Sequence, residues 1–232
     1  MNRVITSFFL IAMCLFSCKK EYQLVENEDS DYFPIELGQI RIYAVDSLFY
    51  DDFYEPVKID SSYYQLKELV ADTFRDNTGA LTFRIERYKR YSDSTSWIIN
   101  DIVTVNEFEQ KIERVENNLR QINLIFPFNE NITWKGNAYI HAGPNLDYLD
   151  GWDFAYYDLH QPDTINGYFF DSTALVVQQN DTSLIRKDYF IEKYAKNVGL
   201  YYKEASHLAK QNIGEPWQSG YYIRYELLNY TL

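Results

Sequence analysis

Hydrophobic and polar residues alternate with a period of two along several segments of the chain. The alternation is clearest at residues 81–86 and 221–228. Successive side chains of a strand point to opposite faces of a sheet, so both segments are predicted to be strands. Less regular alternation predicts further strands at 40–50, 63–74, 97–105, 132–140 and 174–179.

Short clusters of Gly, Asn, Asp and Pro separate these segments, and each of them favours a turn. The predicted turns lie at residues 76–79, 135–137, 143–145 and 179–181. Aromatic residues make up 18% of the chain, and they suit a pleated, half-buried surface. Local pattern and composition therefore agree on a protein made mainly of strands.

Two segments, 108–122 and 190–208, carry apolar residues at helical spacing, which alone would allow two amphipathic helices. An Asn-Asn pair at 117–118 and an Asn-Val-Gly run at 197–199 interrupt them, and these residues favour turns. Periodicity thus leaves a helix and a hairpin open for each segment.

The first residues resemble a bacterial lipoprotein signal peptide. A positive charge at Arg3 precedes an apolar run at 4–16, and Ser17 and Cys18 follow. The run is shorter than a permanent membrane-spanning helix. The resemblance implies that residues 1–17 are removed and that Cys18 is lipidated, so that the membrane is a partner through this lipid.

The chain that follows the signal is expected to consist of a lipidated tether and a domain. Residues 18–31 are polar and acidic, and we expect a flexible tether there. Residues 32–232 are expected to form a single β-rich domain. Lys19, rather than aspartate, follows Cys18, which favours the outer membrane and leaves the leaflet undecided, periplasmic or surface.

Composition restricts the chemistry of the mature protein. The chain has two cysteines, Cys14 and Cys18, and both lie in the signal region, so no thiol remains for a disulfide or a zinc site. A net charge of −12 repels phosphate backbones, so nucleic acid is not expected as a partner. The most basic stretch, 84–90, alternates with apolar residues and is interpreted as a solvated strand face.

No catalytic constellation or cofactor motif is found in the sequence. The three histidines are not spaced as paired metal ligands. Asp147, Asp150 and Asp153 are the candidate metal ligands, in a loop that could attract calcium. Their spacing does not match the calcium loop that ends in glutamate, so a solvated acidic loop is the favoured interpretation and no metal is expected.

Adjacent tyrosines occur at 63–64, 156–157, 201–202 and 221–222. In a strand, one member of each pair faces the core and the other faces outward. Outward rings suit sugar stacking, apolar ligands or a protein interface, while cross-strand packing within a Tyr-rich sheet is the simpler interpretation.

Several motifs, in order along the chain, resemble uncharacterised cell-envelope lipoproteins of Bacteroidota. They are the run from Tyr32 to Gln39, the centre at 126–128 and 134–137, and the stretch 194–204. Asn197 stands where that family has glycine, and Arg41 where its opening strand has an aromatic residue. The resemblance implies an antiparallel curved sheet or half-barrel, similar to lipoprotein carriers, with few short helices, and it implies hairpins in both ambiguous segments.

The function expected from these features is that of a lipid-anchored, non-enzymatic cell-envelope lipoprotein. It would bind a protein partner or an apolar ligand; the alternative is a surface glycan-binding lipoprotein. In a half-barrel, alternate residues line one concavity and decide the class of ligand. The residues expected to share the more apolar side are Leu81, Phe83, Ile85, Tyr221, Ile223, Tyr225 and Leu227.

Overall fold

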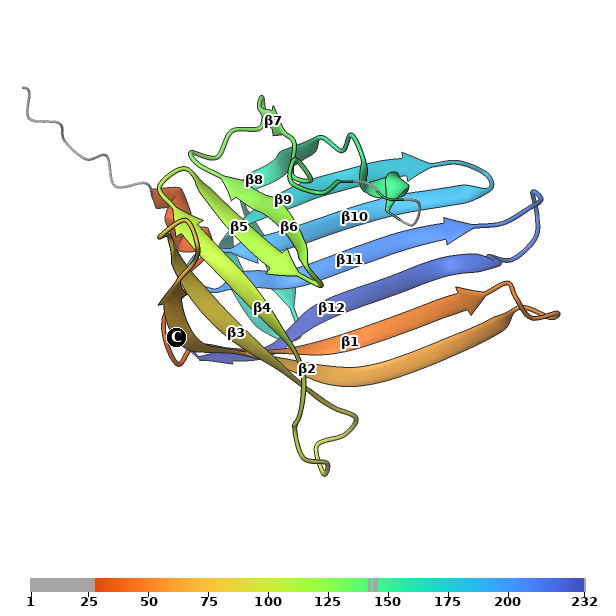
Figure 1. The fold of residues 1–232 in the computed structure, drawn as a ribbon, viewed down its shortest axis with the longest axis horizontal. Helices are drawn as coiled ribbons and strands as arrows, with labels where there is room; N and C mark the ends of the chain where they lie inside the picture. Colours follow the sequence, from red (N-terminus) through yellow and green to blue (C-terminus); the bar gives the residue numbers. More distant parts are fainter. Residues whose placement is uncertain (1–27, 142, 144–145, 232) are drawn as a thin grey trace, which may run out of the picture.

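Every long element of the structure is a β-strand, as Figure 1 shows for a computed structural model that describes residues 28–141, 143 and 146–231. The strands are β1 (Ile40–Asp51), β2 (Lys58–Arg75), β3 (Leu81–Arg90), β4 (Ile98–Phe108), β5 (Lys111–Glu116), β6 (Leu119–Ile125), β7 (Thr133–Trp134), β8 (Phe154–Ile165), β9 (Tyr168–Thr182), β10 (Arg186–Ala195), β11 (Gly199–Ala209) and β12 (Ser219–Thr231). Two 3-10 turns, η2 (Glu28–Tyr32) and η3 (Asp147–Leu149), are the helical elements of the described residues.

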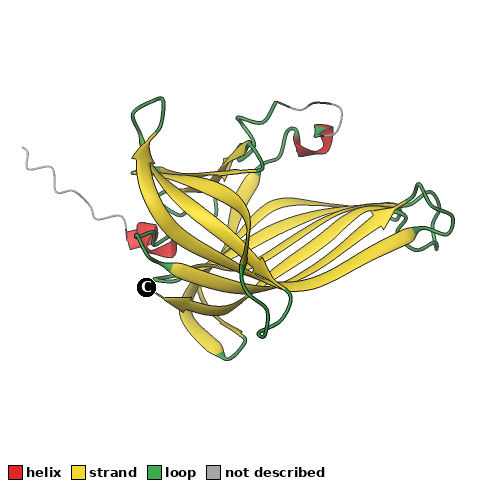
Figure 2. Ribbon diagram, turned by 60° about the horizontal axis from the view of Figure 1, so that its bottom comes forward, coloured by secondary structure: helices red, strands yellow, loops and turns green. Residues whose placement is uncertain are grey.

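All twelve strands form one antiparallel sheet in the order β6-β5-β4-β3-β2-β1-β12-β11-β10-β9-β8-β7. Neighbours in the sheet are neighbours in the chain except at β1 and β12, which pair and bring the two ends of the domain together. The sheet curls so that it nearly closes into a barrel at one end, while its longest hairpins extend beyond the curl (Figure 2). The predicted fold, an antiparallel curved sheet with few short helices, is confirmed.

Backbone and side-chain hydrogen bonds bridge the gap between the two edges of the curled sheet. The backbone N–H of Ile122 on β6 donates to the carbonyl of Gly136 at 2.8 Å, and the Trp134 indole donates to the carbonyl of Ile122 at 2.8 Å. The Tyr156 hydroxyl, on β8, lies 2.8 Å from the carbonyl of Ile125. These contacts satisfy some of the backbone N–H and C=O groups of the edge strand, which would all be paired in a closed barrel.

Both segments that periodicity left ambiguous are hairpins. Asn117 and Asn118 have φ angles of 49° and 62°, which matches the two-residue turn that joins β5 to β6. Asn197 and Gly199 have φ angles of 62° and 92° between β10 and β11. Asparagine tolerates this left-handed region, so Asn197 in place of glycine fits the turn. The hairpins implied by the resemblance are confirmed.

Two local predictions differ from the structure, and one strand was not predicted. Residues 132–140 contain only the short strand β7, and the turn expected at 179–181 lies inside β9, with the chain reversing at 183–185. Strand β8 was not predicted, because its register shifts and its positive φ angles at Asp158 and His160 break the alternation.

The main hydrophobic core lies inside the curl, where residues from both halves of the chain meet. Phe83 and Ile85 belong to it, and Tyr221 and Ile223 pack against it. Tyr225 and Leu227 belong to a second, smaller cluster around Tyr43 and Val45. Leu81, at the start of β3, is 47% exposed, so the prediction that it belongs to the apolar side is wrong.

Candidate ligand-binding cavity

An open cavity of about 380 Å³ lies where the β5–β6 hairpin approaches the long strands. The long strands β1 and β9–β12 supply most of its lining residues, and the β5–β6 hairpin and a loop that contains η3 supply the rest. The lining residues are Ser47, Phe49, Glu116, Asn117, Leu119, Gln121, Tyr148, Leu149, Trp152, Gln178, Phe190, Lys203, Ala205, Tyr221, Ile223 and Tyr225. The predicted apolar residues of β12, at 221, 223 and 225, are thus brought together on the concave side.

Aromatic rings make up much of the wall. Trp152 and Phe190 lie with their ring centroids 4.5 Å apart, and Tyr148 stacks at 6.4 Å from Phe190. Tyr221 meets Phe190 edge to face at 6.4 Å. These separations are typical of favourable aromatic pairs, so the rings hold one another in place around the open space.

Tyr148 fastens the η3 loop, residues 146–152, onto the sheet. Its ring stacks on His207 at 4.1 Å, and its hydroxyl lies 3.3 Å from the Tyr221 hydroxyl. The Trp152 indole donates to the carbonyl of Tyr148 at 2.7 Å, and the Asn137 amide donates to the carbonyl of Leu149 at 2.8 Å. The loop therefore forms a defined wall of the cavity.

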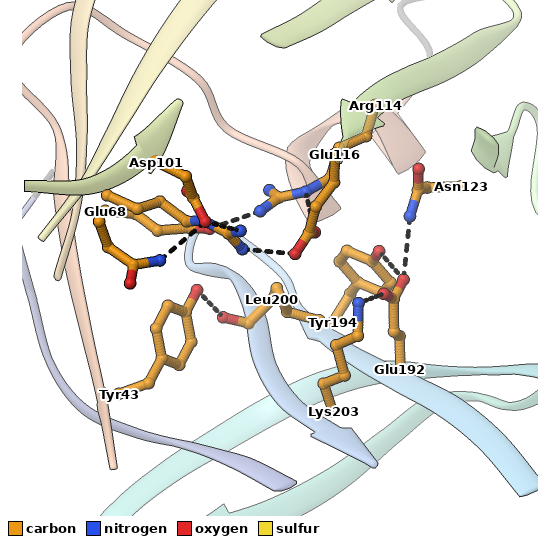
Figure 3. A network of polar contacts seen from close by, with 12 residues as sticks. Tyr43, Glu68, Asp101, Arg114, Glu116, Asn123, Glu192, Tyr194, Leu200 and Lys203 are labelled. Carbon is orange, nitrogen blue, oxygen red and sulfur yellow. Dashed lines mark hydrogen bonds and ion pairs between the residues drawn. The ribbon is translucent and has the colours of Figure 1, made fainter. Parts of the chain in front are cut away.

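The floor of the cavity is charged, and Figure 3 shows the buried network that continues from it. Glu116 accepts a hydrogen bond from Arg87 Nη1 at 2.6 Å and lies 3.5 Å from Arg114 Nε. Arg87 also donates to Asp101 at 2.5 Å, and Arg114 Nη2 donates to Glu68 Oε1 at 2.5 Å. The pairs link strands β2, β3, β4 and β5 across the interior.

A second part of the network centres on Glu192, on β10. Its carboxylate lies 3.2 Å from Lys203 Nζ and accepts hydrogen bonds from the Tyr194 hydroxyl at 2.6 Å and the Asn123 amide at 3.2 Å. Figure 3 places these groups beside Glu116. The carboxylate is therefore fully surrounded by donors, as a buried charge requires.

Both kinds of charge in this network stay ionised. Burial by itself raises the pKa of Glu116, but Lys203, Arg114 and Arg87 together hold that pKa well below its usual range. Burial likewise disfavours the charged form of Arg87, yet Asp101 and Glu116 keep its pKa above the usual value. The floor is thus a set of compensated ion pairs.

The predicted site residues do not converge on a metal centre. Asp147 and Asp150 lie on the η3 loop, and Asp153 pairs with Lys135 at 2.9 Å. Over residues 28–141, 143 and 146–231, no three His, Cys, Asp or Glu side chains are grouped so that they could hold a metal ion. His160 contacts the Tyr32 hydroxyl at 2.8 Å. Cys18 lies outside the described residues.

The interpretation of 84–90 as a solvated strand face is wrong, because Arg87 belongs to the buried network. Arg87 follows Phe83 and Ile85 at the strand period, so it points to the same side as these core residues, and its side chain is 4% exposed. The parity that Arg87 shares with Phe83 and Ile85 is the feature of the sequence that indicates its burial. Arg41, unusual for its position, is likewise buried and donates to the carbonyls of Pro34 and Val198.

The alternation within the tyrosine pairs is seen most clearly on β8, where Tyr156 is buried and Tyr157 is exposed. On β12, Tyr221 lines the cavity.

No protein-family model matches this chain, and no curated protein sequence shows significant similarity to it. Within the described part of the chain, no helix is long and apolar enough to cross a membrane.

Proposed function

We propose that this protein is a lipid-anchored lipoprotein of the outer membrane that binds an apolar ligand without enzymatic activity. The observation that carries the binding proposal is the open cavity walled by Tyr148, Trp152, Phe190 and Tyr221. Its volume of about 380 Å³ falls in the range of small-molecule sites, which are mostly apolar with a few polar groups. The anchor at Cys18 rests on the resemblance of the first residues to a lipoprotein signal.

The polar groups of the cavity support binding rather than catalysis. Glu116 and Lys203 are both held in ion pairs, so neither is positioned as a free acid or base. The hydroxyls of Tyr148 and Tyr221 lie against each other. Residues arranged in this way shape and orient a ligand.

Dye binding tests the proposal directly. N-phenylnaphthylamine, which fluoresces in apolar surroundings, should bind the purified domain at one saturable site. Ile223→Asp places a charge in the cavity wall and should weaken this binding by about tenfold or more, because the new carboxylate must be desolvated. Ile102→Asp, on the exposed face of β4, is the matched control and should leave it unchanged.

The absence of a saturable site in the unmodified domain would refute the cavity as a ligand site. Circular dichroism of both variants separates loss of the site from loss of the fold.

A protein partner is the second candidate, and it is favoured by the tips of three long hairpins. Phe53, Leu184 and Ile213 are 89%, 68% and 69% exposed, and each lies in a different hairpin loop. All three loops lie at the end of the sheet opposite η2 (Figure 1). Large apolar side chains gathered at one end of a molecule are typical of interaction sites.

Photo-crosslinking in cells tests the partner role. A photoreactive phenylalanine at position 53 should give a discrete protein adduct, while the same group at exposed Phe169 should not. Equal labelling from both positions would argue against a specific partner at the hairpin tips.

A further inference from the structure

We propose that the ligand of this cavity is an uncharged amphiphile, an apolar chain whose neutral head carries an oxygen that accepts a hydrogen bond from Gln178. The inference rests on the proposed ligand-binding function and names the class of ligand. It is carried by an unpaired buried amide, by the charge balance of the floor and by the limited number of free polar groups.

Gln178 is the buried polar residue that the protein itself leaves incomplete at this site. It lines the cavity and is 4% exposed, and its Nε2 atom has no hydrogen-bond partner among the described residues. A buried donor without a partner costs on the order of 1–3 kcal/mol. The Nε2 atom itself is buried, so a ligand oxygen recovers that cost once the side chain of Gln178 turns its amide toward the cavity.

A β-bulge lies at Gln178. Phe190 pairs with Gln179, and Ile191 pairs with Val177, so Gln178 is the extra residue of β9 at this point. The bulge leaves Gln178 without a residue opposite it on β10. Gln178 keeps the inward parity of Ala174 and Val176, and it lines the cavity together with Phe190.

The charge balance argues for a neutral head. Glu116 and Lys203 are the charged residues of the lining, and each is paired inside the protein. Beneath the lining, Arg87 also pairs with Asp101, and Arg114 pairs with Glu68, so the charges of the floor are compensated within the protein. An ionic ligand would add an uncompensated charge to a desolvated site, which is costly.

The remaining polar groups argue for an amphiphile rather than a sugar. The Tyr148 and Tyr221 hydroxyls contact each other, and the Gln121 amide donates to Asn137 at 2.8 Å. A sugar would bury many hydroxyls against groups that are already engaged. An apolar chain along Trp152 and Ile223 has no hydroxyls that need partners, and the single oxygen of its head pairs with Gln178.

A series of probes with one chain and different heads tests the inference. Monolauroylglycerol is neutral, laurate is anionic and dodecylamine is cationic at neutral pH. Each is titrated below its micelle concentration against the domain loaded with N-phenylnaphthylamine, and maltotriose serves as the sugar probe. Monolauroylglycerol should displace the dye at a concentration about tenfold lower than either charged probe, and maltotriose should displace none.

Two variants assign the preference to the amide. Gln178→Met should weaken monolauroylglycerol about tenfold and leave dye binding in place, because methionine keeps the size of the side chain and removes its donor. Gln179→Met, next to it on the same strand but outside the cavity lining, should change neither.

The outcomes separate the two levels of the proposal. If dye binds but a charged probe or maltotriose displaces it as well as monolauroylglycerol does, the neutral amphiphile is refuted and the cavity remains a ligand site. An unchanged affinity in Gln178→Met refutes the role of the amide. If neither the dye nor any probe binds saturably, the proposed function fails as well. The probe series on the unmodified domain decides the matter even if Gln178→Met does not fold.

Discussion

Arg114 on β5 and Glu68 on β2 form an ion pair across the interior of the sheet, with Arg114 Nη2 2.5 Å from Glu68 Oε1. Strands β3 and β4 separate the two strands in the sheet order. The pair therefore exists only because the sheet curls back on itself. Both side chains are almost fully removed from solvent, 12% and 5% exposed.

Replacement of Arg114 by methionine should destabilise the domain strongly. The change leaves Glu68 as a buried carboxylate without its main partner, which typically costs about 3–5 kcal/mol. Chemical denaturation followed by tryptophan fluorescence measures the loss in the free energy of unfolding. Lys58→Met is the control, since the Lys58–Asp60 pair is exposed and should contribute less than about 1 kcal/mol. Equal effects of the two changes would contradict a structural role for the buried pair.

Stability should fall as the solution becomes acidic. Burial alone raises the pKa of Glu68, Glu116 and Glu192, but Arg114 for the first and Lys203 for the other two hold each pKa below its usual range. The unfolded chain therefore takes up protons first, as the pH falls through about 4.3, while the folded carboxylates stay ionised. The stabilisation that these three carboxylates contribute is then fully present well above this pH and is lost progressively below it.

Denaturation curves at a series of pH values measure this dependence. Glu116→Gln should lower stability at neutral pH and make the acid loss shallower, because one of the contributing carboxylates is gone. A free energy of unfolding that stays constant down to about pH 3 would contradict the low pKa values of the network.

Gly220 should be intolerant of any side chain. Its φ is +103°, and a Cβ atom would lie 1.8 Å from the backbone oxygen of His207 on the neighbouring strand. Gly220→Ala should therefore cost about 3 kcal/mol or more, since the backbone pairing of β11 with β12 must open. Gly214→Ala is the matched control, with φ +87° and open space around it, and should cost only about 1 kcal/mol. Similar losses for both would show that the close approach at Gly220 is easily relieved.

Cys18 should determine membrane attachment in cells. Cys18→Ala removes the thiol that the lipid would modify, so the domain should move from the membrane fraction to the soluble fraction. Cys14→Ala, in the apolar run of the signal, should leave attachment unchanged. Firm retention of Cys18→Ala in membranes would refute the anchor, and metabolic labelling with a palmitate analogue identifies the modified residue.

Local pattern predicted much of the sheet, because strand alternation and turn preference are properties of neighbouring residues. The strands at 81–86 and 221–228 are of this kind, whereas local pattern left a helix and a hairpin open at 108–122 and 190–208 and the family resemblance implied the hairpins. β8 was missed because bulges shift the parity on which the pattern depends.

The candidate site was predicted only in part. Tyr221, Ile223 and Tyr225 were expected on a concave apolar side, and they line the cavity. Gln178 shares the parity of Ala174 and Val176, but alternation alone did not mark a polar residue there as part of a cavity. Trp152 reaches the site through a loop whose path depends on the stacking of Tyr148 on His207.

The sequence alone thus determined that the chain forms strands and that a turn at residues 76–79 joins two of them. Only the tertiary structure decided that Arg87 and Arg114 lie inside the molecule with their carboxylates. Alternation assigns a side chain to one face of a strand, but it does not say whether that face meets water. Burial depends on which distant strands cover the face, and here the curl brings β5 and β6 over β1 and β9–β12.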